Sequence, residues 1–253
     1  MSSKSAKTKP SSAPAPASGS RRNAILAAIA ALIVAAAVVA VIASGGDDKK
    51  SSSGSTAASL AGVSESKALF AGIDQKADMI GKADAPVTMY EFIDYQCPFC
   101  REFRRSTYPK VVTDNVKTGK LRIISRPLTF IGPESEKAAR AAAAASQQNK
   151  DGEFTQLFYA NQGQENAGYV TDEFINKLYD AVGVDKTKAN AFRKSIDSRD
   201  GITKARKEAE RYGVVSTPTF VVGQTGGPYE KLDIDTANAA GFKAAIDSLA
   251  ENK

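Results

Sequence analysis

The longest hydrophobic pattern in the chain is an unbroken apolar run near its start. Residues 24–43, AILAAIAALIVAAAVVAVIA, contain twenty apolar or small residues in succession, about the length of a helix that crosses a bilayer core. Arg21 and Arg22 precede the run and GGDDKK follows it. The positive-inside rule therefore predicts a single transmembrane helix, with residues 1–23 in the cytoplasm and the rest outside.

The sequence does not decide whether this segment is cleaved or retained. The run exceeds the usual ~7–15 residues of a signal-peptide core, which favours a retained anchor. VIA at 41–43 has the small-residue look of a cleavage site, and cleavage there would give a secreted protein. SRRNAIL at 20–26 resembles a twin-arginine export signal, although Ala24 departs from that pattern. A buried soluble helix is the remaining alternative.

Polar stretches on either side of the apolar run separate it from the globular part. Residues 1–23 are rich in Ser, Ala, Pro and Lys, which predicts a disordered tail with little to bury. Residues 44–63 are rich in Gly, Ser, Asp and Lys, a composition typical of a flexible linker. We therefore expect the folded domain at residues 64–253.

Within this domain, short apolar runs alternate with helical patterns. An apolar run with β-branched and aromatic residues predicts a strand at 85–95, and strand character at 120–130, 217–224 and 229–234 predicts three more. The first helical pattern, 97–119, is interrupted by Pro109. The last one covers 235–252.

The order of these elements predicts an α/β fold with an insertion. A strand–helix–strand half covers about 84–130, and a strand–strand–helix half covers about 212–253. Only helical patterns lie between them, at about 131–211. We therefore expect a small mixed sheet into which a helical domain is inserted.

The net charge of +6 does not indicate a nucleic-acid binder once it is divided along the chain. Five of the positive charges precede residue 24, where there is no acidic residue, which leaves the rest of the chain near +1. A domain that binds nucleic acid usually carries a clustered positive charge. The basic residues at the start are better explained by the apolar segment that follows them.

Cys97 and Cys100, in the stretch YEFIDYQCPFC, are the only cysteines, and the chain has no histidine. A closed zinc site needs four ligands, usually Cys and His, so we expect no metal. The missing histidine also excludes Ser-His and Cys-His nucleophile pairs. A structural disulfide is an open alternative, although closing so short a loop constrains the unfolded chain little.

A reactive pair is the third interpretation, and the local sequence favours it. Pro98 is suited to the first position of a helix, which makes Cys97 the cap beside unsatisfied backbone N–H groups. The helix dipole at that end favours the thiolate and lowers the pKa of the thiol. Cys100 lies one turn further along the same face. We expect Pro98 and Phe99 to leave Cys97 exposed and to offer an apolar surface to a substrate protein.

The sequence resembles the thioredoxin superfamily, and most closely its DsbA-like disulfide-forming members with an inserted helical domain. The resemblance covers about residues 75–250. CPFC follows the first long strand and opens a helix, Glu91 lies six residues before Cys97, GVVSTPTFVV resembles the cis-proline loop, and the helical insertion divides the sheet.

The resemblance implies a role for each matching residue. Cys97 and Cys100 would exchange a disulfide with a client protein, without a cofactor. Glu91 would be a buried acid that assists proton transfer at Cys100. Thr217 and Pro218 would form the cis-proline loop, with the Thr217 backbone pairing with the extended client chain.

The function expected from this resemblance is the formation of disulfides in exported proteins that carry free cysteines. A quinone-linked membrane reoxidase is an implied partner. The strongest oxidants of the family carry CPHC, so Phe99 predicts a milder oxidant with a higher Cys97 pKa. A reductase or isomerase of the same fold and a thioredoxin-like chaperone that binds unfolded chains are the alternatives.

Overall fold

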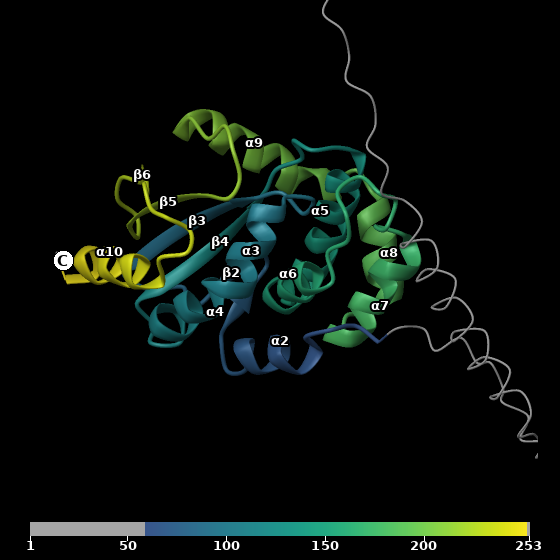
Figure 1. The fold of residues 1–253 in the computed structure, drawn as a ribbon, viewed down its shortest axis with the longest axis horizontal. Coiled ribbons are helices and arrows are strands. Elements are labelled where there is room, and N and C mark those ends of the chain that lie inside the picture. Colours follow the sequence, from purple (N-terminus) through teal and green to yellow (C-terminus); the bar gives the residue numbers. More distant parts are fainter. Residues whose placement is uncertain (1–58, 252–253) are drawn as a thin grey trace, which may run out of the picture. The chain divides into compact units, whose positions relative to one another are not determined.

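The computed structural model describes residues 59–251, which fold around one six-stranded sheet (Figure 1). The strands lie in the order β1-β2-β4-β3-β5-β6, with β3 and β4 parallel and every other neighbouring pair antiparallel. The strands are β1 (Gln75–Lys76), β2 (Met79–Ile80), β3 (Val87–Ile93), β4 (Leu121–Pro127), β5 (Thr219–Gln224) and β6 (Glu230–Lys231).

The helices form two groups along the chain. Those encoded before β4 or after β6 are α2 (Val63–Phe70), α3 (Pro98–Ser106), α4 (Tyr108–Val111), the π-helical turn η1 (Val112–Val116) and α10 (Ala239–Glu251). Those between β4 and β5, which we call the helical lobe, are α5 (Pro133–Ser146), α6 (Asp151–Ala160), α7 (Asp172–Val182), α8 (Lys186–Lys194), the 3₁₀ turn η2 (Asp197–Arg199) and α9 (Asp200–Tyr212). The lobe separates the two halves of the sheet in sequence, as the pattern of the chain predicts.

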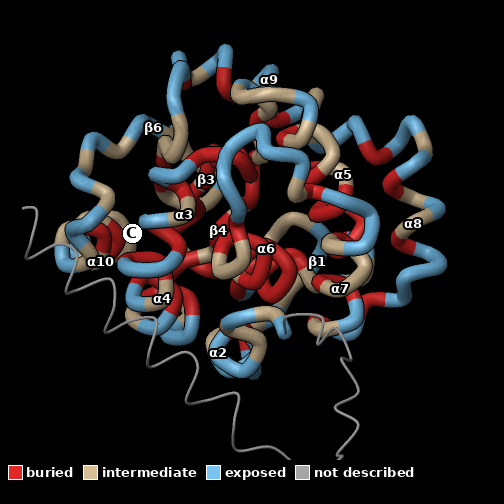
Figure 2. Tube along the Cα trace, turned by 45° about the vertical axis from the view of Figure 1, so that its right-hand side comes forward, coloured by how far each residue is buried: buried red, intermediate tan, exposed pale blue. Residues whose placement is uncertain are grey.

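Strand β3 lies at the centre of the sheet, between β4 and β5. It is almost wholly buried, because helices cover both faces of the sheet. Met89 packs with residues of α3, α4 and α10 on one face, and Phe92 packs with residues of α9 on the other. Figure 2 shows the resulting band of buried chain through the middle of the molecule.

The helix that follows β3 ends where proline interrupts it. Helix α3 runs from Pro98 to Ser106, and a second short helix starts at Tyr108, directly before Pro109. The break at Pro109 follows from the missing N–H of proline and from the clash of its ring with the preceding turn. The chain then continues as the π-helical turn η1.

The core of the helical lobe combines small and aromatic side chains. Helix α5 buries Ala138, Ala141 and Ala145, and their small size lets neighbouring helices approach closely. Phe154 and Phe158 of α6 fill the space beside them and form ring contacts with each other. Cys97 and Cys100 belong to this same buried cluster, so the lobe packs directly against the two cysteines.

One predicted boundary and one part of the predicted sheet need correction. The predicted linker 44–63 ends too late, because α2 begins at Val63 and both Leu60 and Val63 pack against the core of the helical lobe. The short strands β1 and β2 were not predicted, since two residues each are too few to show an alternating pattern.

The predicted membrane segment lies outside the described residues. None of the helices within residues 59–251 is both long and apolar enough to cross a membrane.

Candidate functional site

Cys97 and Cys100 lie at the start of α3, just beyond the end of the central strand. Cys97 is the N-terminal cap of the helix, and its sulfur accepts a hydrogen bond from the Cys100 backbone N–H at 3.4 Å. Both thiols are free in this structure. The cap position was predicted from Pro98, which occupies the first turn of the helix as expected.

The two thiols have opposite electrostatic environments. Hydrogen bonds from the Cys100 thiol, the Thr217 side chain and the backbone of Phe99 and Cys100 outweigh burial and lower the pKa of Cys97 to about 6. Burial, together with the neighbouring Cys97, raises the pKa of Cys100 well above its usual value. At neutral pH the pair therefore holds one thiolate, on Cys97, and one thiol, on Cys100.

Cys97 is less accessible than the sequence suggested. Only 4% of its surface is exposed, whereas Phe99 is 72% exposed. The expectation that Cys97 stands open is therefore wrong, because the chain around Thr217 covers its sulfur. The Sγ of Cys97 lies 3.3 Å from the carbonyl oxygen of Thr217.

The segment that covers Cys97 leads into strand β5. The peptide bond between Thr217 and Pro218 is cis, and β5 begins at the next residue, Thr219. Because β5 pairs antiparallel with β3, this segment lies at the same end of the sheet as the start of α3. Cys97 and Thr217, which are 120 positions apart in sequence, thus meet at the Cys97 sulfur.

Glu91 is fully buried in the middle of β3, and its carboxylate faces Arg104 of α3. The Nε and Nη2 atoms of Arg104 donate to the two carboxylate oxygens at 2.8 and 2.7 Å, and neither side chain is exposed. Burial raises the pKa of Glu91, and the Arg104 charge opposes that rise. Among the described residues, no hydrogen bond joins Glu91 to either cysteine, so its direct partner is Arg104.

Sequence reasoning missed Arg104, although the chain carries a signal for it. Cys100, Phe103 and Arg104 occupy helix positions that share one face, and all three are buried. An arginine on an apolar helix face needs a partner, and the only acid in β3 is Glu91. The guanidinium also lies 3.8 Å from the centre of the Tyr108 ring.

A second missed residue comes from the helical lobe. The side-chain amide of Gln162, just after α6, donates to the backbone carbonyls of Tyr95 and Cys97 at 2.7 and 3.2 Å. Gln96 is held in a similar way, since its side chain donates to the Tyr169 hydroxyl and accepts from the Asn166 N–H. These contacts join the helical lobe to residues 95–97, the segment that ends in the helix cap. No local sequence pattern predicts them.

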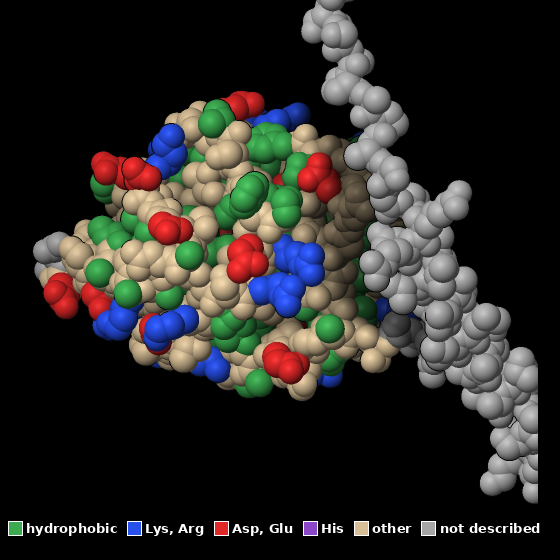
Figure 3. Space-filling model, viewed as in Figure 1, with side chains coloured by type: hydrophobic (Ala, Val, Ile, Leu, Met, Phe, Trp, Pro, Cys, Tyr) green, Lys and Arg blue, Asp and Glu red, His purple; other side chains and the backbone are tan. Residues whose placement is uncertain are grey.

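The surface around the site is apolar and partly basic. Phe99, Phe130 and Val215 are large hydrophobic residues with 54 to 87% of their surface exposed. Figure 3 shows hydrophobic side chains gathered over the start of α3, with a group of basic side chains beside them. An exposed apolar surface of this kind is typical of a site that contacts another chain.

Comparison with known proteins gives one family match and several relatives. The family model described as thioredoxin matches residues 74–247. Disulfide bond formation protein D of Bacillus subtilis is 27% identical over 149 residues, which are 57% of this chain and 66% of that protein. A probable disulfide bond formation protein D of Bacillus cereus is 29% identical over 134 residues, 52% of this chain and 62% of that one. The matches thus span less than two thirds of these relatives.

A solved structure shows the same fold. The crystal structure of oxidised BdbD from Bacillus subtilis superposes with a TM-score of 0.61 at 21% identity. The superposition covers 71% of this chain and 97% of that one. The thioredoxin-like α/β architecture with its helical lobe is therefore shared.

Proposed function

We propose a function from the premise that the chain belongs to the thioredoxin family: it is a thiol–disulfide oxidoreductase that works through Cys97 and Cys100. The observation that carries this proposal is the position of Cys97 as the cap of α3, where its Sγ accepts from the Cys100 N–H at 3.4 Å and lies 3.3 Å from the Thr217 carbonyl oxygen. The hydrogen bonds there lower the pKa of Cys97, while burial raises the pKa of Cys100. A stable thiolate beside a buried thiol is what an exchange reaction needs. The names of the Bacillus relatives support the same activity.

In the oxidising direction, the reaction starts from the Cys97–Cys100 disulfide. A client thiolate attacks the Sγ of Cys97, the S–S bond of the enzyme breaks, and Cys100 leaves and takes up a proton. A second client thiolate then attacks the client sulfur of the mixed disulfide, and Cys97 leaves as a thiolate. Two electrons pass from the client to the enzyme, and the low pKa of Cys97 makes it a good leaving group.

The buried pair of Glu91 and Arg104 is our candidate for proton handling at Cys100. Glu91 was expected to assist alone, but its carboxylate is held by two hydrogen bonds from Arg104. We therefore assign the role to the pair: Glu91 takes up the proton when Cys100 ionises and returns it when Cys100 leaves, and the charges of the Cys100 thiolate and Arg104 offset each other in between. For the client, we propose contact with the exposed Phe99 and pairing with the backbone of Thr217 beside Pro218.

The proposed cellular role is the formation of disulfides in exported proteins. It rests on the apolar run at 24–43, which we propose anchors the catalytic domain outside the cell membrane, or else directs secretion after cleavage. Reoxidation by a quinone-linked membrane protein is part of the same proposal. The clients are unfolded or partly folded proteins with free cysteines.

A reductase or isomerase of the same fold is the second candidate, and Phe99 is the observation that favours it. The pKa of Cys97, about 6, lies between the ~3.5 of the strongest oxidant and the ~7 of thioredoxin. Equilibration of the Cys97/Cys100 couple with glutathione separates the two. A reduction potential between about −120 and −180 mV supports the oxidant, and one near −270 mV supports the reductant.

The catalytic proposal itself is tested with Cys97→Ser in dithiol-oxidation and insulin-reduction assays. We expect turnover to be lost, and Cys100→Ser to accumulate a mixed disulfide with the client. A chaperone that only binds unfolded chains would retain its full effect in both variants. Unchanged turnover in Cys97→Ser contradicts the exchange mechanism.

A further inference from the structure

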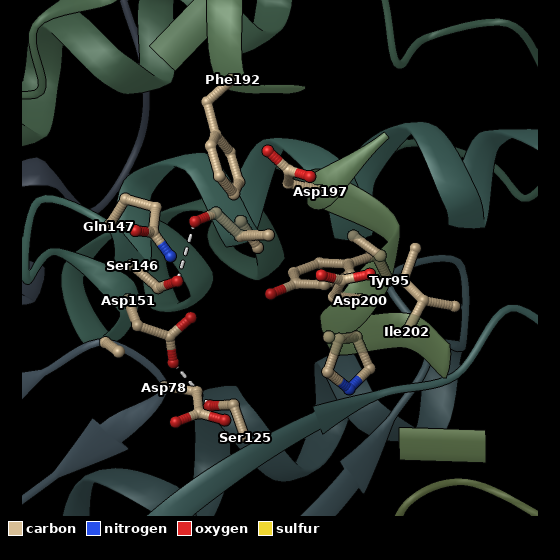
Figure 4. Close-up of a pocket in the computed structure, with 16 residues that line it drawn as sticks. Asp78, Tyr95, Ser125, Ser146, Gln147, Asp151, Phe192, Asp197, Asp200 and Ile202 are labelled. Carbon is tan, nitrogen blue, oxygen red and sulfur yellow. Dashed lines mark hydrogen bonds between the residues drawn. The ribbon is translucent and has the colours of Figure 1, made fainter. Parts of the chain in front are cut away.

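A cavity of about 280 Å³ lies where the helical lobe meets the sheet, and neither cysteine lines it (Figure 4). Packing in protein interiors normally leaves few voids larger than a water molecule. An apolar cavity of about 150 Å³ is already large enough to hold benzene. The space beside the lobe is therefore large enough for a small organic molecule.

One wall of the cavity is apolar because α5 carries alanines there. Ala139, Ala142 and Ala143 lie along the cavity, and their short side chains leave it unfilled. Phe192 of α8 and Ile202 of α9 continue the apolar lining. A ligand lying against this wall would need a hydrocarbon body.

Acidic side chains lie on two sides of this wall. Figure 4 shows Asp151 and Asp78 on one side, and Asp197 and Asp200 on the other. Asp151 is 97% buried, and Ser125 donates to its Oδ2 at 2.5 Å, but within residues 59–251 no donor reaches its second oxygen. Asp78 already forms an ion pair with Arg126 at 2.6 Å.

Apart from Asp78, the acids that line the cavity form no ion pair within residues 59–251. No lysine or arginine is among the lining residues, and within the described part of the chain Asp197 and Asp200 form no ion pair. Burial raises the pKa of Asp151 to about 7, although the Ser125 hydrogen bond and the charge of Arg104 oppose that rise. No group of Cys, Asp and Glu within residues 59–251 is arranged to hold a metal ion. An organic cation fits the lining better.

We propose that this cavity binds a short alkyl diammonium ion. One ammonium group lies at the buried Asp151, the other lies at Asp197 and Asp200, and the methylene chain lies against the alanine wall of α5. An ammonium group supplies three donors, and so it can pair with the open oxygen of Asp151. The apolar wall buries the methylene groups between the two charged ends.

Calorimetric titration of the reduced full-length protein tests the proposal with three compounds of equal chain length. The probes are 1,4-diaminobutane, n-butylamine and 1,4-butanediol at matched ionic strength. We expect the diamine to bind, the monoamine to bind about tenfold more weakly or worse, and the diol not to bind. Similar affinities for the diamine and the monoamine, or binding of the diol, would overturn the proposal.

Variants at each end of the cavity locate the binding. Asp151→Asn and Asp200→Asn should each weaken binding of the diamine about tenfold or more. Asp233→Asn removes the same charge from an exposed position outside the cavity and should leave binding unchanged. Ala142→Leu should abolish binding by filling the space. An unaltered affinity in both Asp200→Asn and Ala142→Leu contradicts the proposal.

Folding of these variants is checked independently of the diamine. None of the substituted side chains forms a hydrogen bond or ion pair with Cys97 or Cys100 within residues 59–251, so each folded variant should retain thiol–disulfide exchange in the absence of diamine. Asp200 is exposed, so its variant remains informative if Asp151→Asn does not fold.

Discussion

At the scale of single residues, Phe99 affects the reduction potential of the Cys97–Cys100 pair more than it affects whether the pair can exchange a disulfide. Its side chain points into solvent and leaves stabilisation of the Cys97 thiolate to the Cys100 thiol, the Thr217 side chain and the helix cap. Together these groups lower the pKa of Cys97 to about 6. A histidine at position 99 would add a donor or a positive charge beside the sulfur.

If the protein exchanges disulfides as proposed, Phe99→His should therefore make it a stronger oxidant. We expect the pKa of Cys97 to fall by about one unit and the reduction potential to rise by about 30 mV, since both correspond to ~1.4 kcal/mol. Absorbance of the thiolate at 240 nm gives the pKa, and glutathione equilibration gives the potential. Phe99→Leu is the matched control and should change neither. The same values for His and Leu at position 99 would contradict this account of the site.

The pair of Glu91 and Arg104 is the second residue-scale determinant, because two opposite charges are buried together. Arg104→Met should lower the free energy of unfolding by about 3–5 kcal/mol, since it leaves the Glu91 carboxylate without a partner. Urea denaturation measures the loss. Lys110→Met removes one member of an exposed pair with Asp114 and should cost about 0.5 kcal/mol or less. Equal losses of unfolding free energy in the two variants would contradict a buried ion pair between Glu91 and Arg104.

At the scale of elements, the packing of α6 against α2 depends on a close contact between Gly152 and the Phe70 ring. A Cβ added to Gly152 would come within 2.6 Å of the Phe70 ring. Gly152→Ala should therefore destabilise the protein by about 1–3 kcal/mol, despite the better helix propensity of alanine. Gly201→Ala in α9 is the control, because its Cβ would meet nothing within 4 Å. Thermal unfolding should show a lower Tm for the first variant and an equal or higher Tm for the second.

The elements that the sequence predicted are those with a strong local pattern. The long strands β3, β4 and β5 have six or seven residues rich in β-branched and apolar side chains, and α3 has a cap and a proline at its start. The short strands β1 and β2 lack such a pattern. Within residues 59–251, β1 pairs only with β2, and β2 in turn pairs with β4, more than forty residues away.

The predictability of the site follows the same division. Cys97 and Cys100 could be placed from the residues next to them, and Thr217 and Pro218 only from a family resemblance. Gln162 could not be found, since its contact with the Cys97 carbonyl joins residues 65 positions apart. The exposure of Cys97 was misjudged for the same reason, because a distant segment covers it.

At the scale of the whole molecule, the buried Asp151 couples stability to pH. Burial raises its pKa to about 7 in the folded protein, against opposing contributions from Ser125 and Arg104, while the unfolded chain has a value near 3.9. The folded state therefore binds more protons between pH 4 and 7. The contribution of Asp151 to stability is fully present below pH 4 and is lost as pH rises towards 7.

Asp151→Asn should remove this pH dependence. Relative to the variant, the wild-type protein should lose up to about 1.4 kcal/mol of stability per pH unit between pH 5 and 7. Urea unfolding at pH 5, 6, 7 and 8, without amines in the buffer, measures the difference. A constant difference between the two proteins across this range would show that Asp151 is ionised throughout.

The contacts of Cys97 with Gln162 and Thr217 also bear on biosynthesis. A ribosome makes residue 97 well before residues 162 and 217, which lie 65 and 120 positions later. Until Thr217 has emerged and docked, the Cys97 sulfur lacks one of the hydrogen bonds that lower its pKa, and until Gln162 has done so the Cys97 carbonyl lacks its partner. In an incomplete chain the pKa of Cys97 is therefore higher and less of it is thiolate, so the cysteine reaches its full reactivity only once the fold is nearly complete.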